Sequence, residues 1–251
     1  MSAKSGKSEK SGKSEDMEHE QRRGGLPTPS THPSDLRLEP QRGLEALAPL
    51  LALLSRLVLR EFNAELLAAL RQPDMLEVFD KAQPGCARYL NQENWPTHNV
   101  EQAFEQAAVD FTGLFIVPEG VRPQASAWLP GERESVGAQI SGLALNVMQT
   151  LQLQPDDPDM RGLRPDHLAV LLALVSATLH SDNPQERQIG KDLFAQSLAP
   201  WLPAFGRSVN KRAQIPVYQA LGTLLAQVAQ FSSEPNAEPG EEVLSVSLSV
   251  S

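Results

Sequence analysis

The sequence predicts an all-α protein with a single helical domain of eight to nine helices. Apolar residues recur at spacings of three and four over most of 43–232, which is the period of a helix that buries one face. Strand patterns are confined to Leu114–Val117 and to the end of the chain, Val246–Ser251. A domain of roughly 190 residues can bury a core without a metal or disulfides.

The first half of this domain holds two predicted helical regions. Leucines form one stripe over 43–71, as one long helix or as two helices joined near Arg60. A short helix is expected from Pro73 to about Lys81, because proline suits the first position of a helix.

The second half of the domain alternates predicted helices with loops. Asn99 is placed to cap a helix that carries apolar residues as far as Phe115, and Pro118 ends it. Residues 117–131 are rich in proline and glycine and form a loop. Further helices are expected at about 133–152, 166–180, 185–198, 201–209 and 216–231.

Residues 1–42 and 233–251 are predicted to be disordered tails. The unit Lys-Ser-Gly-Lys-Ser-Glu occurs at 4–9 and again at 10–15, and such a composition cannot bury enough apolar surface to fold. The net charge of the whole chain is -9 and that of 43–232 is -6, so the acidity belongs mainly to the helical domain.

Composition excludes several classes of protein. The one cysteine, Cys86, cannot form a disulfide within the chain or a cysteine-based zinc site, and indicates a reducing compartment. The longest apolar stretch, Leu44–Leu59, contains charged residues and a proline and is too short to span a membrane. Acidity argues against nucleic acid and favours a basic partner.

Two segments of the first tail resemble known motifs but do not match them. Gly6–Ser14 is similar to a phosphate-binding loop, but five residues instead of four separate its glycines and no strand precedes it. Arg22 and Arg23 look like a twin-arginine export signal, yet glycine, proline, threonine and serine follow where such a signal has its apolar region.

The sequence gives no support for an enzyme, and it predicts no catalytic residue, no metal site and no cofactor. His167 and His180 lie thirteen residues apart on one predicted helix, too far to share a metal. The aspartates at 156, 157 and 159 lack the glycine and the final glutamate of a calcium loop.

Three places put aromatic, proline or polar residues outside the regular apolar stripe. The first is Pro165-Asp166-His167, where Asp166 is expected to cap a helix and His167 to lie in its first turn. The second is the rigid aromatic corner Pro200–Phe205. The third combines Asp110–Phe115 with the long loop that leads to Ser126-Ala127-Trp128, since a loop of this length often has a function.

Taken in order, these motifs resemble the TorD/DmsD/NarJ family of redox-enzyme maturation chaperones. The resemblance covers about 45–231 and is strongest over 104–231. It departs from the family pattern at Arg164-Pro165, Ser197 and Gln124. The matching segments are Leu114–Pro118, Ser126–Leu129, Asp166–Leu168, Pro200–Phe205 and Tyr218–Gly222.

The resemblance implies a cytoplasmic chaperone that binds the twin-arginine signal peptide and the apo form of a molybdenum-cofactor oxidoreductase, helps cofactor insertion and delays export. In this interpretation Asp166 faces an arginine, and His167 beside it tunes binding or release through its charge. The residues that would bind the signal peptide are Phe111, Leu114, Phe115, Pro123, Trp128, Asp166, His167 and Trp201.

Other functions stay open on the sequence alone. A helical scaffold or adaptor would explain the periodicity and the acidity, but not the ordered series of motifs. A hydrolase using Asp166 and His167 would need a nucleophile that the sequence does not offer. The resemblance allows a monomer or a helix-swapped homodimer, and it leaves open which oxidoreductase is served and whether GTP is bound.

Overall fold

The computed structural model describes residues 43–91, 100–154 and 157–232. Within these ranges the chain forms ten α-helices, joined by loops and short 3₁₀ turns, and no strand. The all-α prediction is therefore confirmed. The predicted tails at 1–42 and 233–251, the cap at Asn99 and the strand pattern at Val246–Ser251 lie outside the described residues.

The apolar stripe over 43–71 forms two helices, α1 (Ala48–Leu59) and α2 (Ala64–Leu70), after a 3₁₀ turn at Leu44–Leu47. The break is at Arg60, whose backbone is extended, as the sequence allowed. Asn63 starts α2 because its side-chain oxygen accepts a hydrogen bond from the Leu66 N–H at 2.9 Å.

The short helix expected after Pro73 is α3 (Pro73–Ala82), and the sequence missed α4 (Cys86–Leu90) behind it. Asp80 holds the start of α4, since its carboxylate accepts hydrogen bonds from the N–H groups of Gly85 (3.0 Å) and Ala87 (2.9 Å). A helix of five residues is too short to show a periodic pattern.

The strand suggested at Leu114–Val117 is wrong. Helix α5 (Val100–Phe111) runs directly into a π-turn, Thr112–Ile116, closed by a hydrogen bond of 3.1 Å from the N–H of Val117 to the carbonyl of Thr112. A short apolar run is ambiguous by itself, and here the preceding helix supplies its backbone partners.

The C-terminal helices follow the predicted order, with bounds shifted by a few residues. Loop 117–131 contains one 3₁₀ turn, and a second precedes α7. Helix α10 continues into a last 3₁₀ turn, Ala229–Ser232. The helices are α6 (Arg133–Thr150), α7 (Leu168–Leu179), α8 (Pro184–Ser197), α9 (Leu202–Arg212) and α10 (Pro216–Val228).

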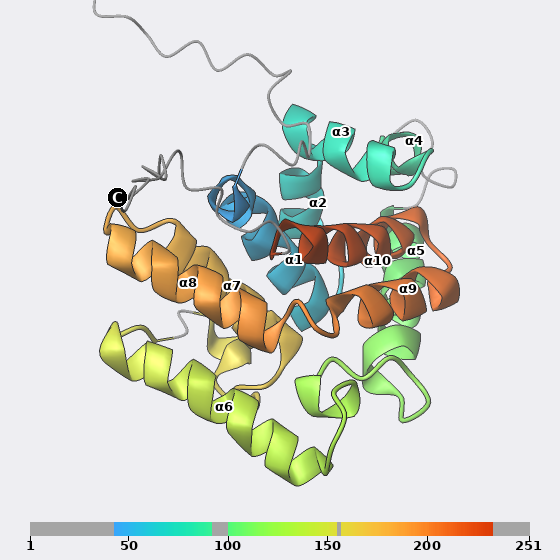
Figure 1. The fold of residues 1–251 in the computed structure, drawn as a ribbon. Coiled ribbons are helices and arrows are strands. Elements are labelled where there is room, and N and C mark those ends of the chain that lie inside the picture. The colour runs from blue at the N-terminus through green and yellow to red at the C-terminus, as the bar shows by residue number, and fades with distance from the viewer. Residues whose placement is uncertain (1–42, 92–99, 155–156, 233–251) are drawn as a thin grey trace, which may run out of the picture. The chain divides into compact units, whose positions relative to one another are not determined.

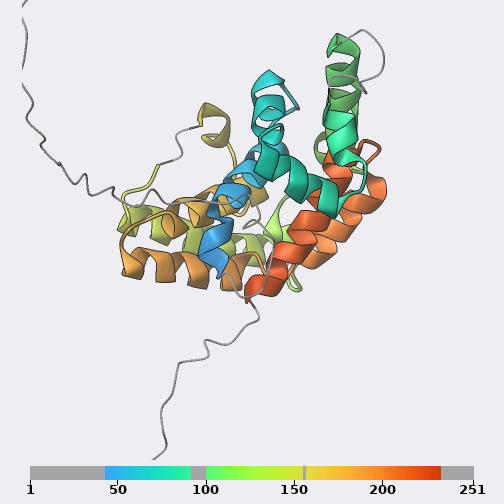
Figure 2. The same ribbon diagram turned by 90° about the horizontal axis from the view of Figure 1, so that it is seen from above.

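The buried core joins α1, α7 and α10. Helix α7 packs against α1 and α8, and α10 packs against α9, α3 and α4. Figure 1 shows α7 and α8 running side by side, and Figure 2 shows the close pair α9 and α10 from above. None of the helices in the described ranges combines the length and the apolarity that crossing a membrane requires.

Candidate functional site

Loop 117–131 is joined to the start of α7. The N–H of Ala125 donates to the carbonyl of Asp166 at 3.0 Å, and the N–H of Leu168 donates to the carbonyl of Pro123 at 2.7 Å. Two motifs about forty residues apart in the sequence therefore lie side by side.

Asp166 does not cap α7, which corrects the prediction from sequence. The cap is His167, whose Nδ1 accepts a hydrogen bond from the N–H of Ala169 at 3.2 Å. The helix starts later than predicted because the backbone of Asp166 and Leu168 is bonded to loop 117–131.

The side chain of Asp166 is completely buried, and it is paired within its own chain. Its Oδ1 lies 3.0 Å from Nε of Arg164, whose side chain is 60% exposed. The other oxygen, Oδ2, has no hydrogen-bond partner among the residues that the structure describes. Helix α6 passes close by at Gly137, where a Cβ atom would lie 3.3 Å from that oxygen.

His167 is buried as well. Removal from water lowers the pKa of its imidazole to about 4, although the neighbouring Asp166 carboxylate acts in the opposite direction. At neutral pH the ring is therefore uncharged, as its role as a hydrogen-bond acceptor for Ala169 requires.

The aromatic residues of the other motifs form one cluster around Phe205. The ring centroid of Phe205 lies 5.5 Å from that of Trp201, 5.6 Å from Trp128 and 6.4 Å from Phe115. Phe111 extends the cluster, with its centroid 5.3 Å from Phe115. Motifs from three parts of the sequence thus meet in one place.

Most of the residues predicted to bind a peptide are nevertheless buried. Only Phe115 and Trp128 are partly exposed. The buried ones are Phe111, Leu114, Pro123, Asp166, His167 and Trp201.

Exposed apolar residues that sequence reasoning missed lie in the last turn of α5 and in and just after the π-turn that follows it. Val109 is 68% exposed and Ile116 is 65% exposed, and Val117 is exposed too. The spacing of seven between Val109 and Ile116 was visible in the sequence, but the π-turn that decides which residues face outward was not.

Asp110 connects α5 to the start of α10. Its Oδ2 accepts hydrogen bonds of 2.9 Å from the N–H groups of both Gln214 and Ile215. Burial raises the pKa of this carboxyl, and the two N–H donors act against the increase.

We expect Asp110→Ala to lower the free energy of unfolding by about 2 kcal/mol, because it leaves the buried N–H of Ile215 and the partly buried N–H of Gln214 without their acceptor. Asp110→Asn keeps an acceptor oxygen and should cost less. Denaturant titration measures both, with Asp192→Ala on the exposed side of α8 as the control. Equal stability of Asp110→Ala and the wild type would contradict the role of this carboxylate.

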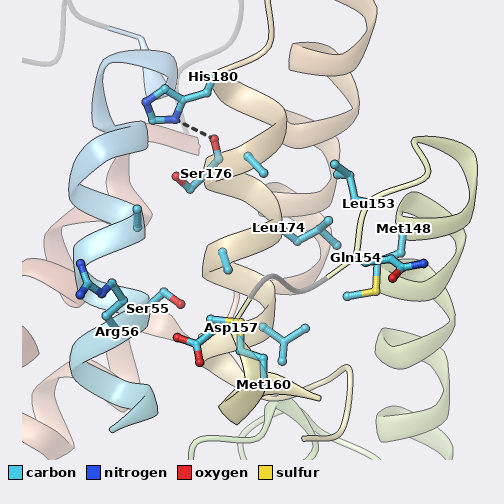
Figure 3. A pocket seen from close by; sticks show the side chains of 14 residues that line it. Ser55, Arg56, Met148, Leu153, Gln154, Asp157, Met160, Leu174, Ser176 and His180 are labelled. Carbon is cyan, nitrogen blue, oxygen red and sulfur yellow. Dashed lines mark hydrogen bonds between the residues drawn. The ribbon is translucent and has the colours of Figure 1, made fainter. Parts of the chain in front are cut away.

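A groove lies along α7, and we call it the α7 groove (Figure 3). Its volume is about 410 Å³. The view extends from His180 at one end to Met160 at the other, with Arg56 on the α1 side and Met148 on the opposite side. The lining residues are Ala52, Ser55, Arg56, Met148, Leu153, Gln154, Asp157, Met160, Val170, Ala173, Leu174, Ser176, Ala177 and His180.

The floor of the α7 groove is one face of α7, from Val170 to His180. These ten steps of 1.5 Å span about 15 Å, the length of roughly three helical turns. The small side chains of Ala173 and Ala177 leave the groove open, so a ligand can approach the helix closely.

Two buried serines fix the floor against α1. The hydroxyl of Ser55 donates to the carbonyl of Ala169, and the hydroxyl of Ser176 donates to the carbonyl of Ala48, each at 2.7 Å. Both hydroxyls are used inside the protein, so the exposed lining is mainly apolar. The groove could not be predicted from the sequence, because a helix that is apolar on every face is normally interpreted as buried in the core.

Charged residues surround one end of the α7 groove. Arg56 pairs with Glu65, and Arg60 pairs with Asp157 and lies 3.8 Å from Asp159. Of these five residues, Arg56 and Asp157 line the groove itself, and each is held by an ion pair to a residue beside it.

Neither a metal-binding cluster nor a reactive cysteine is found among the residues that the structure describes. No three of their histidine, cysteine, aspartate or glutamate side chains come together in a way that could hold a metal ion. Burial raises the pKa of the Cys86 thiol to about 12, which leaves it protonated and unreactive at neutral pH.

Two comparisons with known proteins found relatives of this chain. Residues 72–207 match the family described as nitrate reductase delta subunit. The chain is also 31% identical over 194 residues to the chaperone protein TorD of Shewanella loihica, which covers 72% of this chain and 88% of that protein.

Proposed function

Because the chain belongs to the NarJ/TorD-type family of redox-enzyme maturation chaperones, we propose that it binds the twin-arginine signal peptide of a molybdenum-cofactor oxidoreductase. It would act in the cytoplasm on the apo form of this client, assist cofactor insertion and delay export until insertion is complete. The role is binding and release, with no bond made or broken.

The α7 groove is the observation that carries this proposal. A signal peptide has a basic end followed by an apolar stretch that can form a helix, and a helix binds in an apolar groove through residues spaced by three and four. The groove is about as long as three helical turns, its floor is mainly apolar, and Asp157 at its charged end could face a basic residue of the peptide.

The composition of α7 supports the same conclusion. Its twelve residues, Leu168–Leu179, include no charged side chain, and a helix that is apolar all round is normally covered on every side. Ala177 is exposed and Ala173 is only partly buried, so no described residue fully covers this face of α7. A bound apolar helix would complete its burial.

The aromatic cluster is the second part of the proposed peptide site. Phe115 and Trp128 offer partly exposed rings, and the exposed Ile116 directly follows Phe115 in the sequence. Phe111, Leu114, Pro123 and Trp201 would support them from behind, and Asp166 and His167 would orient the basic end of the peptide.

Filling the α7 groove should abolish most of the binding. We expect Ala177→Phe to weaken the affinity for the client's signal peptide at least tenfold, because one bulky side chain would occupy space that the peptide needs. Calorimetric titration of the full chain with the peptide measures this change.

Ala195→Phe is the matched control, since Ala195 is exposed on α8 and does not line the groove. It should bind as the wild type does. The groove assignment is wrong if Ala177→Phe also binds with unchanged affinity. The proposed function itself is wrong if the wild type binds no signal peptide from any twin-arginine molybdenum oxidoreductase of its host.

A further inference from the structure

The carboxylate of Asp166 is buried but only half paired. Its Oδ1 receives the Nε–H of Arg164 at 3.0 Å, while Oδ2 has no hydrogen-bond partner among the described residues. A buried ionised carboxylate is stabilised best when donors reach both of its oxygens. A donor group that reaches both oxygens would therefore stabilise this carboxylate better than Arg164 does.

Arg164 covers this carboxylate from the solvent side. Its side chain is 60% exposed, whereas that of Asp166 is not exposed at all. With only Pro165 between them in the sequence, Arg164 approaches from the side and uses Nε rather than its two terminal nitrogens. One of those nitrogens, Nη2, points to α6 instead, 2.4 Å from where a Cβ on Gly137 would be.

We propose that Asp166 is a guanidinium-binding site that Arg164 fills in the free chaperone and an arginine of the client's signal peptide fills in the complex. This inference rests on the proposed function and adds a competitor built into the chain. The incoming guanidinium would use two parallel N–H groups for both oxygens of Asp166. Arg164 would move outward into solvent, where most of its side chain already lies.

The chemistry selects arginine over lysine. A guanidinium presents two donors in a plane that matches the two oxygens of a carboxylate, whereas an ammonium group is a point charge. A peptide whose arginines are replaced by lysine should therefore gain little from the removal of Arg164.

The first test compares peptide affinities by calorimetry. Arg164→Ala should bind the signal peptide about fivefold to tenfold more tightly than the wild type, because one internal charge-assisted contact no longer has to be broken. Arg161→Ala, which removes an exposed arginine three residues earlier, is the matched control and should bind as the wild type does. The gain should disappear in the double variant Arg164→Ala with Asp166→Asn.

The second test follows Arg164 directly. The Nε–H of Arg164, assigned in the nitrogen-15 NMR spectrum by its loss in Arg164→Ala, should exchange slowly in the free protein and quickly once the peptide is bound. Slow exchange in the complex would overturn the inference, and so would unchanged or weaker binding by Arg164→Ala. Either result can occur while the peptide still binds, so it leaves the proposed function standing; absence of binding by every variant would instead remove the proposed function.

Discussion

Replacing Gly222 with alanine should lower the free energy of unfolding by about 3 kcal/mol. For a domain of this size that corresponds to a fall in melting temperature of about 6 to 12 °C. The cause lies at the crossing of α9 and α10. A Cβ on Gly222 would lie 2.4 Å from the backbone nitrogen of Asn210 and 2.5 Å from the carbonyl oxygen of Gly206.

The protein cannot relieve these close contacts by a small local movement. The atoms that a new methyl group would strike belong to the backbone of α9, so the two helices would have to move apart. The contact is mutual, because a Cβ on Gly206 would lie 2.4 Å from the carbonyl oxygen of Gly222. Separating α9 from α10 would also loosen the aromatic cluster, to which α9 contributes Phe205.

Thermal unfolding followed by circular dichroism measures the effect. Gly142→Ala is the matched control, since Gly142 lies inside α6 with nothing within 4 Å of a new Cβ. Alanine is the better helix former by up to about 1 kcal/mol, so this variant should be slightly more stable than the wild type. A Gly222→Ala protein that melts with the wild type would show that α9 and α10 do not touch as closely as described.

Acid should destabilise the protein through His167. The pKa of this imidazole is about 4 in the folded protein and 6.5 as an ordinary value. Between these values the unfolded chain binds a proton that the folded protein does not, so stability falls as the pH falls from 6.5 towards 4. The full difference corresponds to about 3 kcal/mol.

Two physical effects add up in this prediction. Protonation would place a charge in a buried position, and it would also remove the acceptor that Nδ1 offers to the N–H of Ala169 at the start of α7. Asp166 offsets part of the first effect. The raised pKa of Asp110 contributes with the opposite sign, since that group adds stability as the pH falls through its folded pKa.

The measurement is the free energy of unfolding at several pH values between 7 and 4 for the wild type and for His167→Asn. Asparagine can still cap α7 but does not titrate, so the variant should lose less stability in acid. The difference between the two proteins removes the contribution of Asp110. His180→Asn, at the exposed end of α7, controls for the loss of an imidazole, and parallel curves for the wild type and His167→Asn would refute the prediction.

The order and the type of the helices could be predicted because each depends on neighbours in the sequence. The leucine stripe of α1 and α2 and the prolines at the starts of α3, α8 and α10 are local signals. The sequence failed where contacts between distant segments decide the backbone. Asp166 is the example, since its bond to loop 117–131 moved the cap of α7 to His167.

The candidate site was predictable in part for the same reason. The series of motifs identified the family and named aromatic residues that do come together around Phe205. It could not show that Trp201 and Phe111 are buried, or that Val109 and Ile116 are exposed. Side-chain exposure depends on which other helices pack against a residue, and periodicity describes only one helix at a time.

The sequence by itself determined the all-α fold, the helix order and the family, because helix periodicity, caps and ordered motifs are written in local patterns. Only the tertiary structure decided where the α7 groove lies, that Arg164 covers Asp166, and that Gly206 and Gly222 touch. Each of these depends on the distance between segments that are separate in the chain or on the direction of one side chain. Close packing fixes both of these, and no single stretch of sequence contains them.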